Sequence, residues 1–170
     1  MEFFELLNKR YSVRAYQSTP VETQKLHQVL EAARLAPTAA NRQPFQIIAA
    51  HVAGKEEALQ RVYHREWFIQ APLVLCVCAL KSQAWVRSHD ALNAAAMDSA
   101  IVMTHIILAA ADLGLGTCWV GAFDPQAARE VFQLPPGVEP AALTPLGYPA
   151  DTLPPKTRRP LQELVRYEHW

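Results

Sequence analysis

The stretch 91-ALNAAAMDSAIVMTHIILAAADL-113 decides what kind of fold this chain can form, because it is long and mostly apolar. As a helix it would measure roughly 35 Å at about 1.5 Å per residue, which suits the central helix of a globular domain. A helix that is apolar almost all round has to be buried on several sides. A lipid-facing span, in contrast, would not tolerate the polar residues along it, which are Asn93, Asp98, Ser99, Thr104, His105 and Asp112. We therefore expect a core helix, whose many alanines also permit close approach of a second subunit.

The elements around this segment mix helices and strands without the strict alternation of a parallel βαβ fold. Apolar residues at helical spacing predict a helix that opens at Thr19-Pro20 and stops at Ala36-Pro37. Other apolar runs and boundary residues predict strands at Phe45–His51, Leu73–Leu80, Thr117–Val120 and Leu143–Leu146, and helices at Lys55–Tyr63 and Asp124–Phe132. Together they predict an α+β sandwich, in which a small mixed β-sheet is flanked by helices and the long helix is central.

The totals predict one domain over residues 1–170, since this length is ordinary for a single domain. The 16 Lys and Arg residues balance 16 Asp and Glu residues, so no overall field attracts nucleic acid or an anionic membrane. Cys76, Cys78 and Cys118 lack metal-ligand or disulfide-framework spacing, and the six histidines never pair at ligand spacing. Free thiols and the lack of an apolar N-terminal signal region predict a cytoplasmic protein without a metal site.

The C-terminal part of the sequence differs in composition from the rest. From Tyr148 to Pro160 it is rich in proline and has no apolar periodicity. We expect an extended arm, about residues 148–170, that runs over the surface rather than through the core.

Two groups of basic residues stand near opposite ends of this neutral chain: Arg10-Tyr11-Ser12-Val13-Arg14 and Lys156-Thr157-Arg158-Arg159. A phosphate dianion needs several cations and a hydroxyl or backbone donor to replace its water. If the two ends meet in the fold, five of these residues form one anion site: Arg10, Ser12, Arg14, Lys156 and Arg158. Two solvated surface patches are the alternative, and charge alone favours that alternative.

Several catalytic motifs are absent from the sequence. It contains no G-x-S-x-G nucleophile motif and no P-loop. The glycines of Gly114-Leu-Gly116-Thr-Cys-Trp-Val-Gly121 follow a helix and enter a strand, the reverse of the order in a dinucleotide-binding motif. Since no nucleophile or general-base pair stands out, an enzyme of this sequence would depend on a bound cofactor.

Taken in order, several motifs make the chain resemble the nitroreductase-like flavoenzymes, an FMN-dependent family of intertwined homodimers. The resemblance runs from Arg10 to about Val165. It rests on Arg10-Tyr-Ser-Val-Arg14 with Pro20-Val21, Glu31-Ala-Ala-Arg-Leu-Ala-Pro37-Thr-Ala-Ala-Asn41-Arg-Gln43-Pro44, Gly114-Leu-Gly-Thr-Cys-Trp-Val-Gly121-Ala-Phe123, Leu146-Gly-Tyr-Pro149 and Lys156-Thr-Arg158-Arg-Pro160. Each motif is weak alone, but their order and spacing together are specific.

The resemblance implies a role for both basic groups. The FMN phosphate would be held by Arg10, Ser12, Lys156 and Arg158, with Tyr11 and Val13 in the same binding segment. Arg14 matches a position from which a basic side chain reaches the ribityl chain and the pyrimidine edge of the flavin. Positive charge at that edge would stabilise the reduced, anionic flavin.

Two further motifs would complete the flavin site. Pro37, Thr38 and Ala39 match the loop that approaches the flavin from the other subunit. The amides of Asn41 and Gln43 could meet ribityl hydroxyls or flavin carbonyls, or could simply stabilise a turn. The stretch Val120, Gly121 and Ala122 would direct a backbone N–H at flavin N5, and a glycine lets the backbone come close.

The resemblance thus implies an FMN-dependent NAD(P)H oxidoreductase that reduces nitroaromatic or quinone-type acceptors by ping-pong hydride transfer. Flavin N5 carries the hydride, so no side chain receives a catalytic role. Pocket walls from both subunits would make the homodimer obligatory, with Leu161–Tyr167 packed on the partner. Two alternatives stay open: a specialised branch for reductive dehalogenation, flavin cleavage or substrate dehydrogenation, and a non-catalytic flavin-binding module.

Some residues depart from the family pattern or have no role in it. Between Tyr63 and Leu73 the chain lacks the asparagine-and-lysine pair that larger members place beside the flavin pyrimidine, and His64, Arg65 or Gln70 would have to substitute. Trp119 is expected to be a core or interface aromatic. Asp98 and His105 lie seven residues apart on the long helix and could pair with each other, without a catalytic role.

Overall fold

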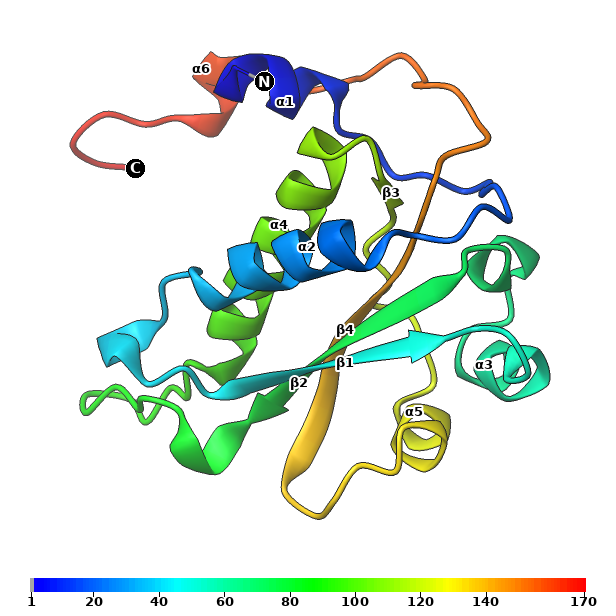
Figure 1. Cartoon of the computed structure of the whole chain (residues 1–170). Coiled ribbons are helices and arrows are strands. Elements are labelled where there is room, and N and C mark those ends of the chain that lie inside the picture. The colour runs from blue at the N-terminus through cyan, green and yellow to red at the C-terminus, as the bar shows by residue number, and fades with distance from the viewer. Residues whose placement is uncertain (1) are drawn as a thin grey trace.

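The computed structural model describes residues 2–170, in which a four-stranded antiparallel sheet lies between two layers of helices (Figure 1). The strand order is β1-β2-β4-β3. The strands are β1 (Phe45–His51), β2 (Leu73–Leu80), β3 (Gly116–Thr117) and β4 (Val138–Gly147). The helices are α1 (Phe3–Lys9), α2 (Thr23–Arg34), α3 (Glu56–Val62), α4 (Ala95–Asp112), α5 (Pro125–Val131) and α6 (Leu161–Leu164), with short 3-10 turns at Ala39–Asn41, Glu66–Ile69 and Lys81–Gln83.

Strand β2 forms the centre of the sheet, and its two faces support the two layers of helices. Leu73, Leu75 and Val77 belong to the cluster packed against α2 and α4. Cys76 and Cys78 point to the opposite face, against α3 and α5. Successive side chains of a strand alternate between faces, so a strand covered on both sides becomes an unbroken apolar run. Both cysteines are therefore small buried residues of the core.

The α+β prediction is confirmed, with one qualification about the sheet. All pairings between the named strands are antiparallel. Among residues 2–170, parallel pairing is limited to one isolated bridge between Ser12 and Thr117, so the sheet is mixed only at that bridge.

The predictions for β1 and β2 match the structure residue for residue, whereas β4 is longer and β3 shorter than predicted. Strand β4 contains Pro140 and Pro145, and proline is a residue type that disfavours a strand. Pro140 is tolerated because β3 pairs only with the far end of β4, which leaves the first half of β4 open on one side. Next to Pro145, the hydroxyl of Thr144 accepts a hydrogen bond from the Cys118 amide at 3.0 Å. At Cys118 this side-chain contact replaces the backbone hydrogen bond between β3 and β4, so β3 ends at Thr117.

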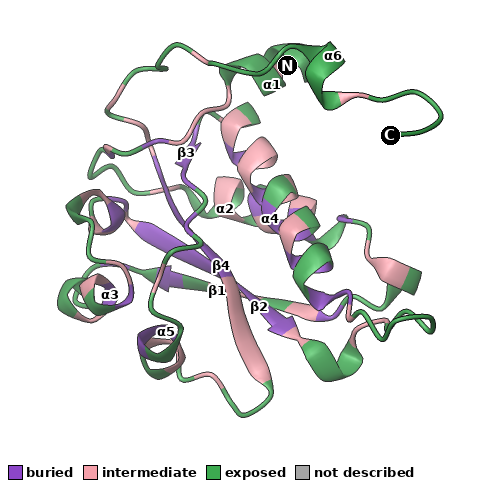
Figure 2. Cartoon of the chain, turned by 180° about the vertical axis from the view of Figure 1, so that it is seen from behind, coloured by how far each residue is buried: buried purple, intermediate pink, exposed green. Residues whose placement is uncertain are grey.

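Helix α4 is the core helix that its composition predicted, although it starts at Ala95 rather than Ala91. Ala91 has a φ of +57°, and the side chain of Asn93 accepts a hydrogen bond from the Ala95 amide at 3.0 Å. The helix is long and apolar enough to cross a membrane by length and composition alone. Its inward face instead packs against α2 and the sheet, as the buried (purple) part of α4 in Figure 2 shows.

The segment after β4 runs back along the N-terminal segment. Tyr16 forms an isolated bridge with Pro149, and the Ala150 amide donates to the Ala15 carbonyl at 2.8 Å. The arm then reaches α1, and Figure 1 shows the short helix α6 (red) at the same end of the molecule as α1 (dark blue). The two ends of the chain are therefore neighbours in the fold.

Candidate functional site

Both basic groups of the sequence line one surface cavity of about 190 Å³, which we call the basic cavity. Its walls are Arg10, Tyr11, Ser12, Arg14, Pro154, Pro155, Lys156, Thr157 and Arg158. Four of these side chains are cationic, and no carboxylate side chain belongs to this set. The prediction that the two groups meet is confirmed, and the alternative of two separate surface patches is wrong.

The N-terminal wall of the basic cavity is held by the edge of the sheet. The Val13 amide donates to the Thr117 carbonyl at 2.9 Å, and the Val13 side chain is buried. Gly116 makes this approach possible, since a Cβ at that position would lie 2.7 Å from Cγ2 of Val13. With Val13 turned inward, its neighbours Ser12 and Arg14 face the cavity.

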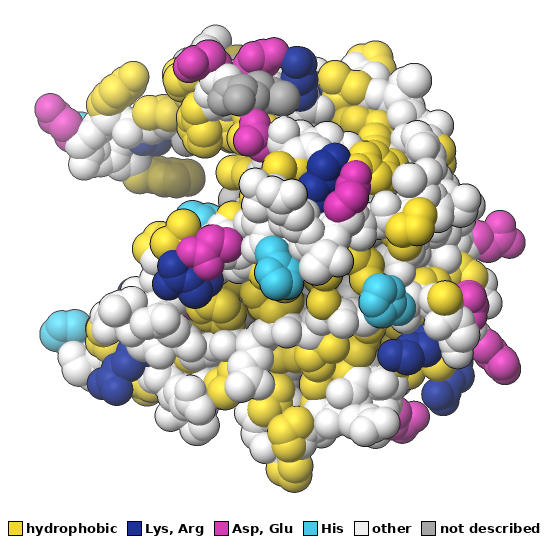
Figure 3. All heavy atoms as spheres, viewed as in Figure 1, with side chains coloured by type: hydrophobic (Ala, Val, Ile, Leu, Met, Phe, Trp, Pro, Cys, Tyr) yellow, Lys and Arg dark blue, Asp and Glu magenta, His cyan; other side chains and the backbone are white. Residues whose placement is uncertain are grey.

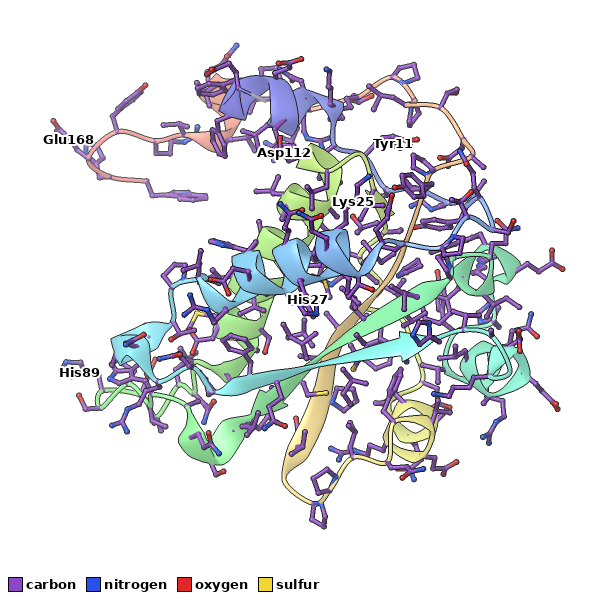
Figure 4. All side chains as sticks on the ribbon, in the orientation of Figure 1. Tyr11, Lys25, His27, His89, Asp112 and Glu168 are labelled. Carbon is purple, nitrogen blue, oxygen red and sulfur yellow. The ribbon has the colours of Figure 1, made fainter. Side chains whose placement is uncertain are left out.

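Asp151 joins the two walls of the basic cavity. The Tyr11 hydroxyl donates to the carboxylate of Asp151 at 2.9 Å across 140 positions of sequence, and Figure 4 shows Tyr11 beside the C-terminal arm. The other carboxylate oxygen accepts from the Arg14 amide at 2.8 Å. Burial, followed by the hydrogen bond to Asp151, raises the pKa of Tyr11 to about 12. The rise extends the pH range over which the Tyr11 hydroxyl is protonated and donates to Asp151.

Lys156 brings the arm onto the end of α1. Its ammonium donates to the Leu7 carbonyl at 2.9 Å and also to the Asn8 carbonyl, which places a cation at the C-terminus of a helix. Burial, followed by the nearby charges of Arg10 and Arg158, lowers the pKa of Lys156. The positive charges thus oppose one another, and an anion between them would relieve this repulsion.

The loop from Pro37 to Gln43 lies far from the basic cavity within one chain, beyond the opposite end of α2 (Figure 1). The Gln43 amide donates to the Thr38 hydroxyl at 3.0 Å, and the Gln43 side chain donates to the Asn41 side chain at 3.2 Å. The two side-chain amides thus stabilise the turn, which is the second of the two roles that we considered for them. The site residues Pro37, Thr38, Ala39, Asn41 and Gln43 are not brought to the cavity by their own chain.

The stretch Val120 to Ala122 leaves the sheet at its edge. Val120 is buried and exchanges two backbone hydrogen bonds with Leu143, whereas Gly121 and Ala122 are exposed. A Cβ on Gly121 would meet nothing closer than Nε1 of Trp119 at 3.9 Å. Within its own chain, then, no close contact requires a glycine here. Trp119 is 41% exposed, so it is not a core aromatic of its own chain, and its interpretation as an interface aromatic stays a prediction.

The family model described as Nitroreductase family matches residues 7–65 and 52–148, which together make up most of the chain. The chain belongs to the nitroreductase family. Lys156 and Arg158 lie beyond the matched residues.

Individual relatives in the nitroreductase family extend the match to the whole fold. A nitroreductase family protein from Clostridium difficile 630 has a structure with a TM-score of 0.90 and 39% identity, over 100% of both chains. An "FMN reductase [NAD(P)H]" from Bacillus subtilis is 30% identical, covering 98% of this chain and 73% of the relative. An "NADH dehydrogenase" from Thermus thermophilus is 29% identical, covering 92% of this chain and 91% of the relative. These likenesses confirm the nitroreductase fold and the oxidoreductase class.

Of the three residues considered as substitutes for the family's pyrimidine-edge pair, Gln70 lies beside the N-terminal wall. Its side-chain oxygen accepts from the Tyr16 amide at 3.3 Å, two residues beyond Arg14. His64 stacks at an angle on Tyr63 instead, with ring centroids 5.8 Å apart.

Two acidic residues of this nitroreductase-family chain were missed or misread by sequence reasoning. Asp98 does not pair with His105: its Oδ1 accepts from the Ala39 amide at 2.9 Å, and Nδ1 of His105 lies 3.2 Å from the Ala32 carbonyl. The two side chains share one side of α4 but meet different neighbouring segments. Asp151 carried no sequence signal, because its role depends on the meeting of the two ends of the chain.

Proposed function

We propose that this chain binds FMN and works as an NAD(P)H-dependent oxidoreductase that reduces nitroaromatic or quinone-type acceptors. The observation that carries the proposal is the basic cavity, where four cations and the Ser12 hydroxyl converge from opposite ends of the chain. The names of relatives in the same family, among them an FMN reductase that uses NAD(P)H, support the choice of cofactor and electron donor.

The residues of the basic cavity suit the phosphate of FMN. Arg10 and Arg158 can each donate several N–H groups in a fixed plane, and Lys156 adds a point charge. Ser12 supplies a neutral donor. No carboxylate side chain is among the lining residues, and the four cations of the wall outnumber the one Asp151 carboxylate that contacts Tyr11 and the Arg14 amide. We assign the phosphate to Arg10, Ser12, Lys156 and Arg158, with Tyr11 and Val13 shaping the segment.

FMN, when bound, supplies a group that accepts hydride from NADH or NADPH and passes it to an acceptor. The protein would then contribute orientation and charge. The Arg14 amide is held by Asp151, so the guanidinium extends from a fixed backbone and can place positive charge near the flavin pyrimidine. Gly121 and Ala122 are exposed beside the sheet edge, where a backbone N–H can face a ligand.

We further propose a homodimer whose two flavin sites lie at the interface. Within one chain the loop from Pro37 to Gln43 stands away from the basic cavity, so it would serve the site of the partner. Helix α4 carries exposed apolar residues, Met97 and Ile101. A groove of about 390 Å³ between α1 and α4 is lined by Phe3, Leu6, Ala32, His105, Leu108, Ala109 and Asp112. Figure 3 shows hydrophobic side chains (yellow) and a hollow between the C-terminal tail and the body of the molecule.

We also propose that the chain is a single domain and that the protein is cytoplasmic. The three cysteines are buried and free, which suits a reducing compartment. The contacts between the two ends of the chain also favour one folding unit over several.

The test begins with the absorbance spectrum of the purified protein, reconstituted with FMN, before and after anaerobic NADH or NADPH. We expect a flavin spectrum that bleaches on reduction and recovers when menadione or nitrofurazone is added. A protein that binds FMN but stays oxidised would be a flavin-binding module and would refute the oxidoreductase proposal. Failure to bind added FMN would refute the cofactor assignment as well.

A double variant tests the residues that we assign to the FMN phosphate. Replacing Arg10 and Arg158 together by alanine removes two charge-assisted donors, so the Kd for FMN should rise about 100-fold or more in a fluorescence titration. Arg159→Ala is the matched control, because Arg159 pairs with Glu163 at 3.0 Å and does not line the basic cavity. Equal affinities for the double variant and the control would contradict the assignment.

A further inference from the structure

Asp98 is a buried acid for which the proposed function has no role. Its side chain lies in the first turn of α4 and is 2% exposed. Oδ1 accepts from the Ala39 amide at 2.9 Å. Oδ2 is buried and has no hydrogen-bond partner among residues 2–170.

A buried carboxylate with only one hydrogen-bond partner is not expected to stabilise the fold. Burial removes its water, and native structures satisfy nearly all buried polar atoms. The positive end of the α4 dipole offsets part of this cost, since Asp98 stands at the N-terminal turn of the helix. An apolar residue of the same shape would fill the space without an unpaired oxygen. What an apolar residue cannot supply is the acceptor for Ala39.

The hydrogen bond from Ala39 to Asp98 holds in place a loop that has a strained backbone. Ala40, Asn41 and Gln43 all have φ between +50° and +52°, a left-handed conformation that residues with a Cβ adopt rarely. The loop bonds mainly to itself, through Thr38, Asn41 and Gln43. The contact from Ala39 to Asp98 is the hydrogen bond that ties it to α4.

We propose that Asp98 is a positioning residue, which holds the loop from Pro37 to Gln43 in the shape required at the flavin site of the partner subunit. The inference rests on the proposed function, in which this loop completes that site. A displacement of a positioning group by about 1 Å can reduce the rate about 100-fold, so one hydrogen bond behind the loop can control the reaction without touching a reactant.

Three variants separate positioning from mere packing. Asp98→Leu keeps the branched shape and removes both acceptors, whereas Asp98→Asn keeps an acceptor for the Ala39 amide. Ser99→Ala is the matched control: Ser99 is the next residue, equally buried, and its hydroxyl donates to Ala95 within α4 rather than to the loop.

The first measurement uses the protein without flavin, so it does not depend on the proposed function. Hydrogen exchange followed by mass spectrometry reports the Ala39 amide, and limited trypsin cleavage after Arg42 reports the exposure of the loop. We expect Asp98→Leu to lose protection of Ala39 and to be cut at Arg42 at least about 10-fold faster. Asp98→Asn and Ser99→Ala should behave like the wild type. Unchanged exchange in Asp98→Leu, or an equal change in Ser99→Ala, would overturn the proposal.

The second measurement uses the FMN-loaded protein. If the loop shapes the site, Asp98→Leu should lower kcat/KM about 10-fold or more, with rescue by Asp98→Asn and no loss in Ser99→Ala. Normal kinetics in a variant whose loop has been released would refute the functional part of the proposal. If Asp98→Leu does not fold, Asp98→Ala takes its place, and unfolding of both would show that Asp98 serves the fold instead. A wild type that binds no FMN would refute the proposed function while leaving the exchange result valid.

Discussion

Gly116 is the single residue on which the geometry of the basic cavity depends most directly. It lets the segment that carries Arg10, Ser12 and Arg14 pack against the edge of the sheet. Gly121 belongs to the same sequence motif but meets no such crowding in its own chain. Of the three glycines in this motif, Gly116 is thus required by packing, whereas no such contact requires Gly121, and the sequence alone does not separate the two cases.

This difference predicts unequal effects for two similar substitutions. Gly116→Ala would place a Cβ 2.7 Å from Cγ2 of Val13, a buried side chain with little room to move. We expect it to lower the free energy of unfolding by about 1–3 kcal/mol, the usual cost of overpacking. Gly121→Ala, with its nearest neighbour at 3.9 Å, should leave the apoprotein within about 0.5 kcal/mol of the wild type. Urea denaturation of both variants measures the difference, and equal losses would contradict the explanation.

The meeting of the basic residues could be predicted from the sequence only with the family resemblance, because charge alone favoured two separate surface patches. The contacts of two acids, Asp98 and Asp151, could not be predicted. Asp98 and Asp151 act through backbone amides of Ala39 and Arg14, and a contact with a backbone amide selects no residue type in its partner. Acids that contact the backbone of a distant segment can be recognised only in the folded structure, where the two segments lie side by side.

Helix α5 is the element whose boundaries follow most clearly from local chemistry. The Asp124 carboxylate accepts from the amides of Gln126 at 2.8 Å and Ala127 at 3.0 Å, and Pro125 occupies the first helical position. This pair of residues was sufficient to predict the start of the helix.

The cap of α5 predicts a measurable loss of stability. Asp124→Ala leaves two amides at the helix N-terminus without their acceptor and should cost about 1 kcal/mol. For a chain of this size, that corresponds to a decrease of about 2–4 °C in Tm. Asp124→Ser keeps a capping oxygen and should recover most of the loss in differential scanning calorimetry. An alanine variant with the Tm of the wild type would show that the cap contributes nothing.

Strand β4 shows the opposite case, where local rules fail. Pro140 and Pro145 both count against a strand, yet both lie within it. The structure accepts them because the partners on one side are missing or replaced by a side chain. Whether a strand has a neighbour on each side is a property of the sheet order, which no local pattern contains.

At the scale of the whole molecule, the exposed apolar part of α4 is one of the hydrophobic surfaces that a single chain leaves uncovered. The helix is buried on the side of the sheet and exposed at Met97 and Ile101. We have proposed that a second copy covers this surface.

The dimer predicts a response to one charge on that surface. Sedimentation or light scattering of the wild type should give twice the chain mass of 19.0 kDa. Ile101→Glu would bury a carboxylate in the proposed interface and should shift the protein to 19.0 kDa, with weaker FMN binding because both subunits would line the proposed site. Gln28→Glu adds the same charge on the exposed side of α2 and should leave the mass unchanged. A dimer that survives Ile101→Glu would place the interface elsewhere.

The meeting of the two ends of the chain also has a consequence for how the protein is made. The ribosome synthesises Arg10 before Arg158, so the basic cavity cannot exist in a nascent chain that has not yet reached Arg158. Any ligand of that cavity has to be acquired after both walls have been made. The same ligand would then stabilise chains that contain both walls and leave chains terminated before Arg158 to proteolysis.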